Sequence, residues 1–151
     1  IAYAKAHMAT QRPLPLDGAV FVSVCDADKK DVVPIVRQLR EMGFAIHATR
    51  GTRLSIEAAG LGGIVPVQKL KEGSPSVADL MRSRELGLII NTPKGHGPRL
   101  DDAYIRALAI TLNIPCITTM SAARAAVAGI RALRSRQWGV LPLQEYFPPK
   151  K

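Results

Sequence analysis

The sequence predicts an α/β fold, a three-layer sandwich in which a five-stranded parallel sheet lies between two layers of helices. Five short apolar runs, of the kind that form strands buried on both faces, recur along the chain. Between them lie segments with apolar residues at i, i+3, i+4 and i+7, which is the spacing of amphipathic helices. This alternation favours parallel strands joined by right-handed crossovers, as in Rossmann-like and flavodoxin-like sheets.

Residues 1–17 differ in composition from the rest of the chain. The stretch "IAYAKAHMATQ" is helical in composition, and "RPLPLDG" interrupts it with two prolines and a glycine. We therefore expect one element and a linker over residues 1–17, followed by a single domain over residues 18–151. The start at Ile1 instead of Met leads us to expect a segment of a longer protein.

The first half of the domain is predicted to contain two strands and two helices. The strands are "AVFVSV" (19–24) and "FAIHAT" (44–49). The helix between them ends at Gly43, and Pro34 fits it only within the first turn, which places its start near residues 28–31. The apolar residues of this helix share one face: Val32, Ile35, Val36, Leu39 and Met42. A short helix follows at "GTRLSIEAAG" (51–60).

The second half continues the same alternation. "GIVPVQ" (63–68) is a weaker strand, and Pro66 favours an edge position for it. "LGLIIN" (86–91) and "PCITT" (115–119) are predicted as buried strands. Helices are expected at "SPSVADLMRSR", around Ile105, Leu108, Ala109 and Leu112, and around Ala123, Ala126, Val127, Ile130 and Leu133. The tail is expected to pack through Trp138 and Leu141.

The formal net charge of +9 does not predict a nucleic-acid surface. The basic residues are spread over several helices, and no aromatic residues alternate with them as stacking platforms. Solvated helix faces explain the charge better. No apolar run reaches the roughly 18 residues that cross a bilayer. With only Cys25 and Cys116, we expect a cytoplasmic protein with reduced, buried thiols and no disulfide framework.

Hydrogen-bond donors and cations gather where the predicted strands end, which is where open α/β sheets bind ligands. They are Ser23, Lys29, Thr49, Gly51, Thr52, Lys69, Asn91, Thr92, Thr118 and Thr119. A helix opened by Gly51 would point its first N–H groups at an anion, and Gly51 would let the anion approach closely. The pattern therefore predicts an anion site. The alternative is that Thr49, Thr52 and Thr119 only cap helices, and both interpretations stay open.

Metal and nucleophile sites are not predicted. The three histidines have no metal-binding spacing, and no nucleotide-binding Gly-rich motif is present. His47 lies within a strand and is expected to be a structural histidine with its hydrogen bonds satisfied. His96, in a glycine-rich loop, is a weaker candidate for ligand contact. Asp101 and Asp102 are expected in the first turn of a helix, where acidic residues favour the helix dipole.

Several motifs together resemble a known family. They are "SV.D.DK", "GF.I.AT.GT", "V.K..EG.P.V.D", "LIINTP" and "IPCITT". Over residues 18–132 the chain resembles the methylglyoxal-synthase-like domain, and more specifically the C-terminal allosteric domain of the large subunit of bacterial carbamoyl phosphate synthetase. The opening "AYAKAHM" is similar to the helix that ends the preceding synthetase domain, and "LPLQEYF" resembles the end of that subunit.

This resemblance implies a regulatory domain that catalyses nothing, within an enzyme of pyrimidine and arginine biosynthesis. It implies binding of a nucleoside monophosphate, UMP as an inhibitor or IMP as an activator. The implied ligand contacts are Ser23, Lys29, Thr49, Thr52, Lys69, Asn91 and Thr92, with the lysines and threonines on the phosphate and Asn91 on the ribose or base. The implied partners are the rest of the large subunit, the glutaminase small subunit and further copies of the subunit. ATP and Mg²⁺ would act elsewhere in the parent enzyme, with no cofactor in this segment.

Two positions depart from the enteric members of the family. Pro93 replaces a threonine, which removes one hydroxyl and one backbone donor. Cys116, Ile117 and Thr118 stand where those members have Tyr-Asp-Thr at an ornithine site. This difference argues against a response to ornithine and leaves Thr118 as the candidate for a second effector site.

Two other functions remain as alternatives. A methylglyoxal synthase, a lyase acting on dihydroxyacetone phosphate, needs a carboxylate base beside the phosphate. The aspartate that follows a Gly-Gly pair in those enzymes is replaced here by Ser74, although Asp101 remains. The third possibility is a domain that makes only oligomer contacts and binds no ligand.

Overall fold

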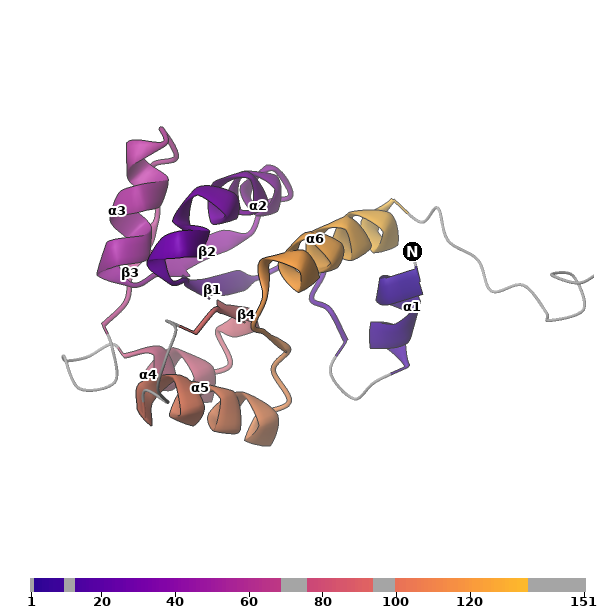
Figure 1. Ribbon diagram of the computed structural model, residues 1–151. Coiled ribbons are helices and arrows are strands. Elements are labelled where there is room, and N and C mark those ends of the chain that lie inside the picture. Colours follow the sequence, from indigo (N-terminus) through magenta and orange to yellow (C-terminus); the bar gives the residue numbers. More distant parts are fainter. Residues whose placement is uncertain (1, 10–12, 69–75, 94–99, 136–151) are drawn as a thin grey trace, which may run out of the picture.

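The computed structural model describes residues 2–9, 13–68, 76–93 and 100–135. Its centre is a five-stranded, all-parallel sheet in the order β3-β2-β1-β4-β5 (Figure 1). The strands are β1 (Ala19–Ser23), β2 (Ala45–Ala48), β3 (Val65–Pro66), β4 (Leu86–Asn91) and β5 (Cys116–Ile117). The predicted parallel α/β sheet is therefore confirmed; β4 has the predicted bounds, and the other four strands are shorter than the apolar runs indicated.

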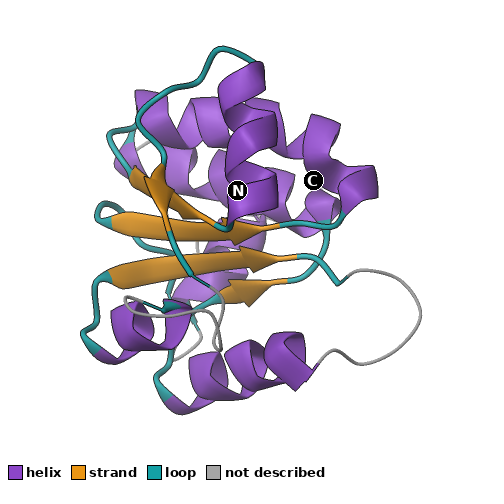
Figure 2. Ribbon diagram, turned by 90° about the vertical axis from the view of Figure 1, so that its left-hand side faces the viewer, coloured by secondary structure: helices purple, strands orange, loops and turns teal. Residues whose placement is uncertain are grey.

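Helices cover both faces of this sheet, which gives the three predicted layers (Figure 2). The helices are α1 (Ala2–Met8), α2 (Lys29–Glu41), α3 (Arg50–Ala58), α4 (Val77–Arg82), α5 (Leu100–Thr111) and α6 (Met120–Arg134). A short 3₁₀ turn, η1 (Asp26–Asp28), precedes α2. Helices α2, α3 and α6 lie on one side of the sheet, and α4 and α5 lie on the other (Figure 1).

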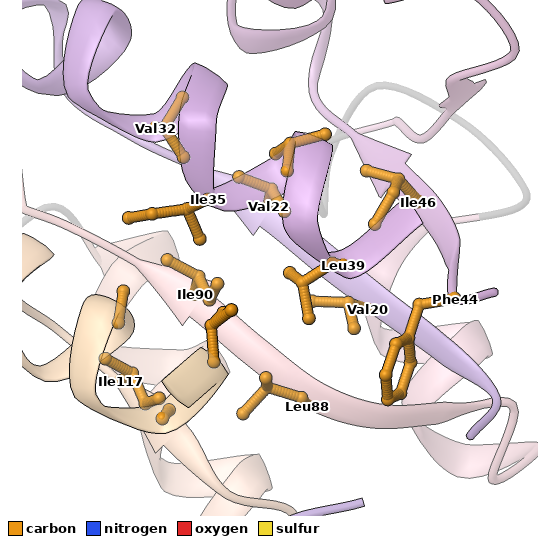
Figure 3. Close-up of a cluster of buried hydrophobic side chains, with 14 of the residues drawn as sticks. Val20, Val22, Val32, Ile35, Leu39, Phe44, Ile46, Leu88, Ile90 and Ile117 are labelled. Atoms are coloured by element: carbon orange, nitrogen blue, oxygen red, sulfur yellow. The ribbon is translucent and has the colours of Figure 1, made fainter. Parts of the chain in front are cut away.

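Alternate residues of the central strands supply the two halves of the core. Val20 and Val22 of β1 face the α2 side, where they pack with Ile35 and Leu39 (Figure 3). Phe21, between those valines, faces the opposite side and packs in a cluster with Val77, Met81, Ile89 and Ile105. Because both faces of β1 are buried from Ala19 to Val22, its sequence is apolar there instead of alternating.

Three expectations about individual residues were wrong. Pro34 lies inside α2, beyond its first turn, because the helix begins at Lys29. Proline has no N–H group, so the carbonyl of Lys30 lacks its helical hydrogen-bond donor. Since Lys30 and Pro34 are both exposed, a water molecule can donate to that carbonyl instead. Cys25 and Cys116 are half-buried free thiols instead of fully buried ones, because Cys25 lies in the loop after β1 and Cys116 in the edge strand β5. Burial still raises the pKa of the Cys116 thiol to about 11.

The N-terminal segment packs onto the domain. Helix α1 lies against α6, and Tyr3 contacts the core cluster beneath it. Leu14 is buried, and Gly87 lies so close to Pro15 that a Cβ atom at Gly87 would meet the proline ring at 3.0 Å. The assignment of residues 1–17 to a preceding domain stays a prediction. The expected contacts of Trp138 and Leu141 lie outside the described residues.

No helix in the described ranges is long and apolar enough to cross a membrane. Both residues of β3 are exposed, which agrees with the edge position that Pro66 indicated.

Gly43 provides a test of this backbone. It ends α2 with a positive φ of 86°, a conformation that side chains with a Cβ rarely adopt. We expect Gly43→Ala to lower the free energy of unfolding by about 1–2 kcal/mol, because of the left-handed conformation alone. The measurement is urea denaturation of the whole chain.

Gly62→Ala is the matched control. A Cβ atom at either glycine would meet nothing within 4 Å, and Gly62 has no positive φ. Gly62→Ala should leave stability unchanged or raise it slightly. Equal effects of the two substitutions would contradict this account of how α2 ends.

Candidate functional site

The strand order places a crevice at the carboxyl ends of β1 and β4. From β1 the chain moves outward to β2 and then β3, whereas β4 and β5 lie on the other side of β1. The connections therefore leave β1 and β4 in opposite directions, and the two loops separate at that point. Ser23, the last residue of β1, pairs in register with Asn91, the last residue of β4.

A pocket with a cavity volume of about 80 Å³ lies in this crevice. It has room for several water-sized groups, since one water needs about 10–15 Å³. Its lining comes from β1, β4, the residues that follow these strands, and the N-terminal parts of α2, α3, α4 and α5: Phe21, Ser23, Val24, Lys29, Thr49, Gly51, Thr52, Val77, Asn91, Thr92, Asp101, Asp102 and Ile105. Seven of the eight main site residues predicted from the sequence thus lie together. The eighth, Lys69, is outside the described residues, and Thr118 does not line the pocket.

Thr49 precedes α3 but does not cap it. Its side chain accepts no hydrogen bond from the first turn of the helix. Instead its hydroxyl donates to the Ser23 hydroxyl over 3.2 Å and lies 3.4 Å from the Thr52 hydroxyl. Thr119, in contrast, accepts from the Ala122 N–H over 3.2 Å and caps α6. The capping interpretation is therefore wrong for Thr49 and right for Thr119.

Two other threonines hold the loop that follows β1. The Thr52 hydroxyl accepts the Val24 N–H over 3.1 Å, and the Thr92 hydroxyl accepts the Cys25 N–H over 3.0 Å. Both threonines are almost fully buried. Because each hydroxyl oxygen accepts from the backbone, each hydroxyl proton remains available to a further acceptor. The two side chains thus combine a structural role with a place in the pocket wall.

Lys29 brings a positive charge to the start of α3. Its Nζ would lie 3.5 Å from a Cβ atom at Gly51, which places the ammonium group in contact distance of the first turn of α3. Nζ also forms an ion pair with Asp26 at 2.7 Å. Helix α3 therefore presents its first N–H groups beside a cation and without a cap from Thr49, an arrangement that suits an anion.

Asp101 and Asp102 bring two carboxylates to the opposite wall, which sequence reasoning missed. Both were expected in the first turn of a helix, and they do lie in the first turn of α5. Since α5 follows β4, that turn faces the same crevice, and this rule could have placed them in the pocket. Asp102 Oδ1 accepts a hydrogen bond from Asn91 Nδ2 over 3.3 Å. Asn91 Oδ1 is buried and finds no partner among the residues that the structure describes.

The histidine expectations are only partly resolved. His47 is half-buried in β2, but its Nδ1 is buried without a hydrogen-bond partner in the described part of the chain, so the expectation of a satisfied histidine was wrong. Burial lowers the pKa of His47, and Glu85 opposes that shift. His96 lies outside the described residues. The described residues contain no group of three or more His, Cys, Asp or Glu that could hold a metal ion.

The sheet order and the pocket define an α/β domain with a pocket at its topological switch point. Comparison with known protein families matches residues 31–118 to the family described as "MGS-like domain". The chain belongs to this family of methylglyoxal-synthase-like domains.

Relatives similar in sequence are carbamoyl phosphate synthase large chains or sections of them. The chain is 42% identical over 147 residues to the carbamoyl phosphate synthase large chain of a Nostoc species, covering 97% of this chain and 13% of that protein. It is 45% identical over 136 residues to the C-terminal section of the Methanopyrus kandleri large chain, covering 89% of this chain and 25% of that protein. The chain thus spans a quarter or less of these relatives.

A solved structure supports the fold. Methylglyoxal synthase from Elizabethkingia anophelis superimposes with a TM-score of 0.62, covering 76% of this chain and 80% of that one. The sequence identity is 18%, so this likeness concerns the fold alone.

The hydrogen bonds of the two threonines near α3 predict unequal costs. Thr52→Val leaves the buried Val24 N–H without an acceptor and should lower the free energy of unfolding by about 1–3 kcal/mol. Thr49→Val removes a bond between two hydroxyls and should cost about 1 kcal/mol or less. Urea denaturation of both variants checks this order, and a larger cost for Thr49→Val would contradict it.

The lowered pKa of His47 predicts that the stability of the fold depends on pH. Because its folded pKa is lowered, the unfolded chain binds more protons below the ordinary value of 6.5, so this residue should reduce stability as the pH falls below 6.5. Urea denaturation between about pH 7.5 and 5 should show a steeper loss in the parent chain than in His47→Gln. The same pH dependence of stability in the parent chain and in His47→Gln would contradict this role of His47.

Proposed function

We propose that this chain is the C-terminal regulatory domain of a carbamoyl phosphate synthase large chain and that its pocket binds a nucleoside monophosphate. One observation carries the ligand class: donors and a cation line one wall of the pocket, and acceptors line the other. The similarity to large-chain sections over 89–97% of this chain supports the parent protein.

The phosphate would lie on the α3 side of the pocket. The first N–H groups of α3, the hydroxyls of Thr49 and Ser23, and the Lys29 ammonium converge there. Helix N-termini bind phosphate because their N–H groups and dipole both favour an anion. Lys69 is proposed as a second cation on the strength of the family resemblance.

The sugar would lie toward α5. Asn91, Asp101 and Asp102 line that wall, and the amide and carboxylate oxygens are hydrogen-bond acceptors. Ribose hydroxyls are the matching donors. A ligand with a phosphate at one end and hydroxyls at the other therefore fits the two walls in one orientation.

The proposed role is regulation without catalysis in this segment. A nucleotide such as UMP or IMP would bind one arrangement of this domain against the synthetase core better than another and so shift the population. The proposed partners are the rest of the large chain, the glutaminase small chain and further copies of the subunit in the cytoplasm, in pyrimidine and arginine biosynthesis. ATP and Mg²⁺ would act elsewhere in the parent enzyme.

The lyase alternative has one point in its favour and is not preferred. Asp101 and Asp102 do line the pocket, and a proton-abstracting base must be a group of this kind. However, the likeness to methylglyoxal synthase rests on 18% identity, whereas the carbamoyl phosphate synthase sections reach 42–45%. Ser74, at the position of the missing acid, lies outside the described residues.

Lys29→Ala tests the site with a matched control. Removing a charge-assisted hydrogen bond to the phosphate should weaken nucleotide binding about 10- to 100-fold. Lys30→Ala removes the same charge from the neighbouring, exposed position, which does not line the pocket, and should change affinity little. Stability should be retained in both, since the Lys29 partner Asp26 has a side chain 77% exposed.

The measurement is calorimetric titration of each protein with UMP and with IMP. No heat from either nucleotide at millimolar concentration would overturn the proposed function. Equal affinity in Lys29→Ala and the parent would overturn the placement of the phosphate. Formation of methylglyoxal from dihydroxyacetone phosphate would favour the lyase instead.

A further inference from the structure

We infer that Asp102 determines which ligands the pocket accepts, by fixing the orientation of the Asn91 amide. This inference rests on the proposed function, because it concerns the same pocket. Asp102 is a positioning residue in this account: it acts on the ligand through Asn91. The result is a pocket that selects phosphate esters carrying hydroxyl donors over those that lack them.

The hydrogen bond between the two side chains fixes the amide. Asn91 Nδ2 donates to Asp102 Oδ1 over 3.3 Å. An ionised carboxylate can only accept, so it must face the NH₂ group of the amide. The flipped amide would set its oxygen against the carboxylate oxygen, and the hydrogen-bond network therefore assigns the orientation. Asn91 is held with its oxygen turned away from Asp102.

That oxygen is the unusual feature of the pocket. Asn91 is 1% exposed, and its Oδ1 is buried with no partner among the described residues. Buried polar atoms are nearly always paired, and an unpaired one costs free energy that a suitable donor recovers. Strand β4 fixes the backbone of Asn91 at its end, in register with Ser23, and the bond to Asp102 holds the side-chain amide in the pocket wall.

The partner that Oδ1 lacks must be a donor. A phosphate oxygen cannot supply one, whereas a hydroxyl or N–H group can. Asp101 lines the same wall, so acceptors gather there, opposite the Lys29 ammonium and the Thr49 hydroxyl. A ligand that brings no hydroxyl or N–H group to this wall would supply no donor to the Asn91 oxygen or to the carboxylates. Sites built around such buried polar groups reject analogues that lack the matching group.

Asp102→Asn should abolish the preference for ligands that carry hydroxyl donors, while the shape of the pocket changes little. The asparagine amide can still accept from Asn91 through its oxygen, or it can turn and donate to Asn91 Oδ1. In the second arrangement Asn91 turns its NH₂ group toward the pocket, and the preference for a donor is lost. Asp102→Ala removes the fixing group altogether and serves as a second variant with the same expected direction.

The experiment compares two ligands on each protein. The whole chain and its Asp102→Asn, Asp102→Ala and Asp31→Asn variants are titrated calorimetrically with UMP and with 2′,3′-dideoxyuridine monophosphate. Asp31 is an exposed aspartate outside the pocket, and its change to Asn controls for the loss of one negative charge. Because a change in pocket charge affects both ligands through the same phosphate, the ratio of the two dissociation constants isolates the hydroxyl contact.

In the parent and in Asp31→Asn, the dissociation constant of the dideoxy analogue should exceed that of UMP at least about tenfold. In both Asp102 variants the two constants should differ about threefold or less. A side-chain amide NMR spectrum of the free proteins should show the Asn91 NH₂ signals shifted in the Asp102 variants. A parent that binds UMP without this preference, or Asp102 variants that keep it, would overturn the inference and leave the proposed function standing. A parent that binds neither UMP nor IMP would overturn both.

Discussion

The pairing of β1 with β4 is the constraint on which the rest of the site depends. It places Ser23 beside Asn91 and creates the crevice where the two connections leave the sheet in opposite directions. Thr52 and Thr92 then accept the next two backbone N–H groups after β1, those of Val24 and Cys25. In this way α3, β1 and β4 are joined at one point, and the pocket walls keep their spacing without a metal or a disulfide among the described residues.

Much of this arrangement follows from the sequence. Apolar runs and helical spacing give the layers, and the rule for parallel strand ends places Ser23, Thr49, Asn91 and Thr92 at one edge. The internal roles do not follow from spacing. A threonine before a helix usually caps it, and only the geometry distinguishes Thr49, which bonds to Ser23, from Thr119, which caps α6. Which hydrogen bond Thr49 forms depends on Ser23, a residue distant in the sequence.

The acidic wall shows a different limit of sequence reasoning. Acidic residues favour the first turn of any helix, so Asp101 and Asp102 carry a sufficient structural explanation in their sequence position alone. Their place beside Asn91 does not follow from that position: its amide donates to Asp102, and its oxygen has no partner among the residues that the structure describes. The contact between Asn91 and Asp102 is visible only in the three-dimensional structure. Lys29 is the reverse case: the sequence places it near a strand end, and the structure confirms that it lines the pocket beside Gly51.

The same hydrogen bonds bear on how a bound ligand would act at a distance. The loop held by Thr52 and Thr92 leads directly into η1 and α2, α2 packs on α6, and α6 packs on α1. The pocket and the N-terminal helix are therefore linked by contiguous packed elements. Contiguity alone does not produce coupling, which requires a ligand to prefer one of two arrangements of those elements. The loop after β1 is where such a preference would act first, because the Thr52 and Thr92 side chains that hold this loop also line the pocket.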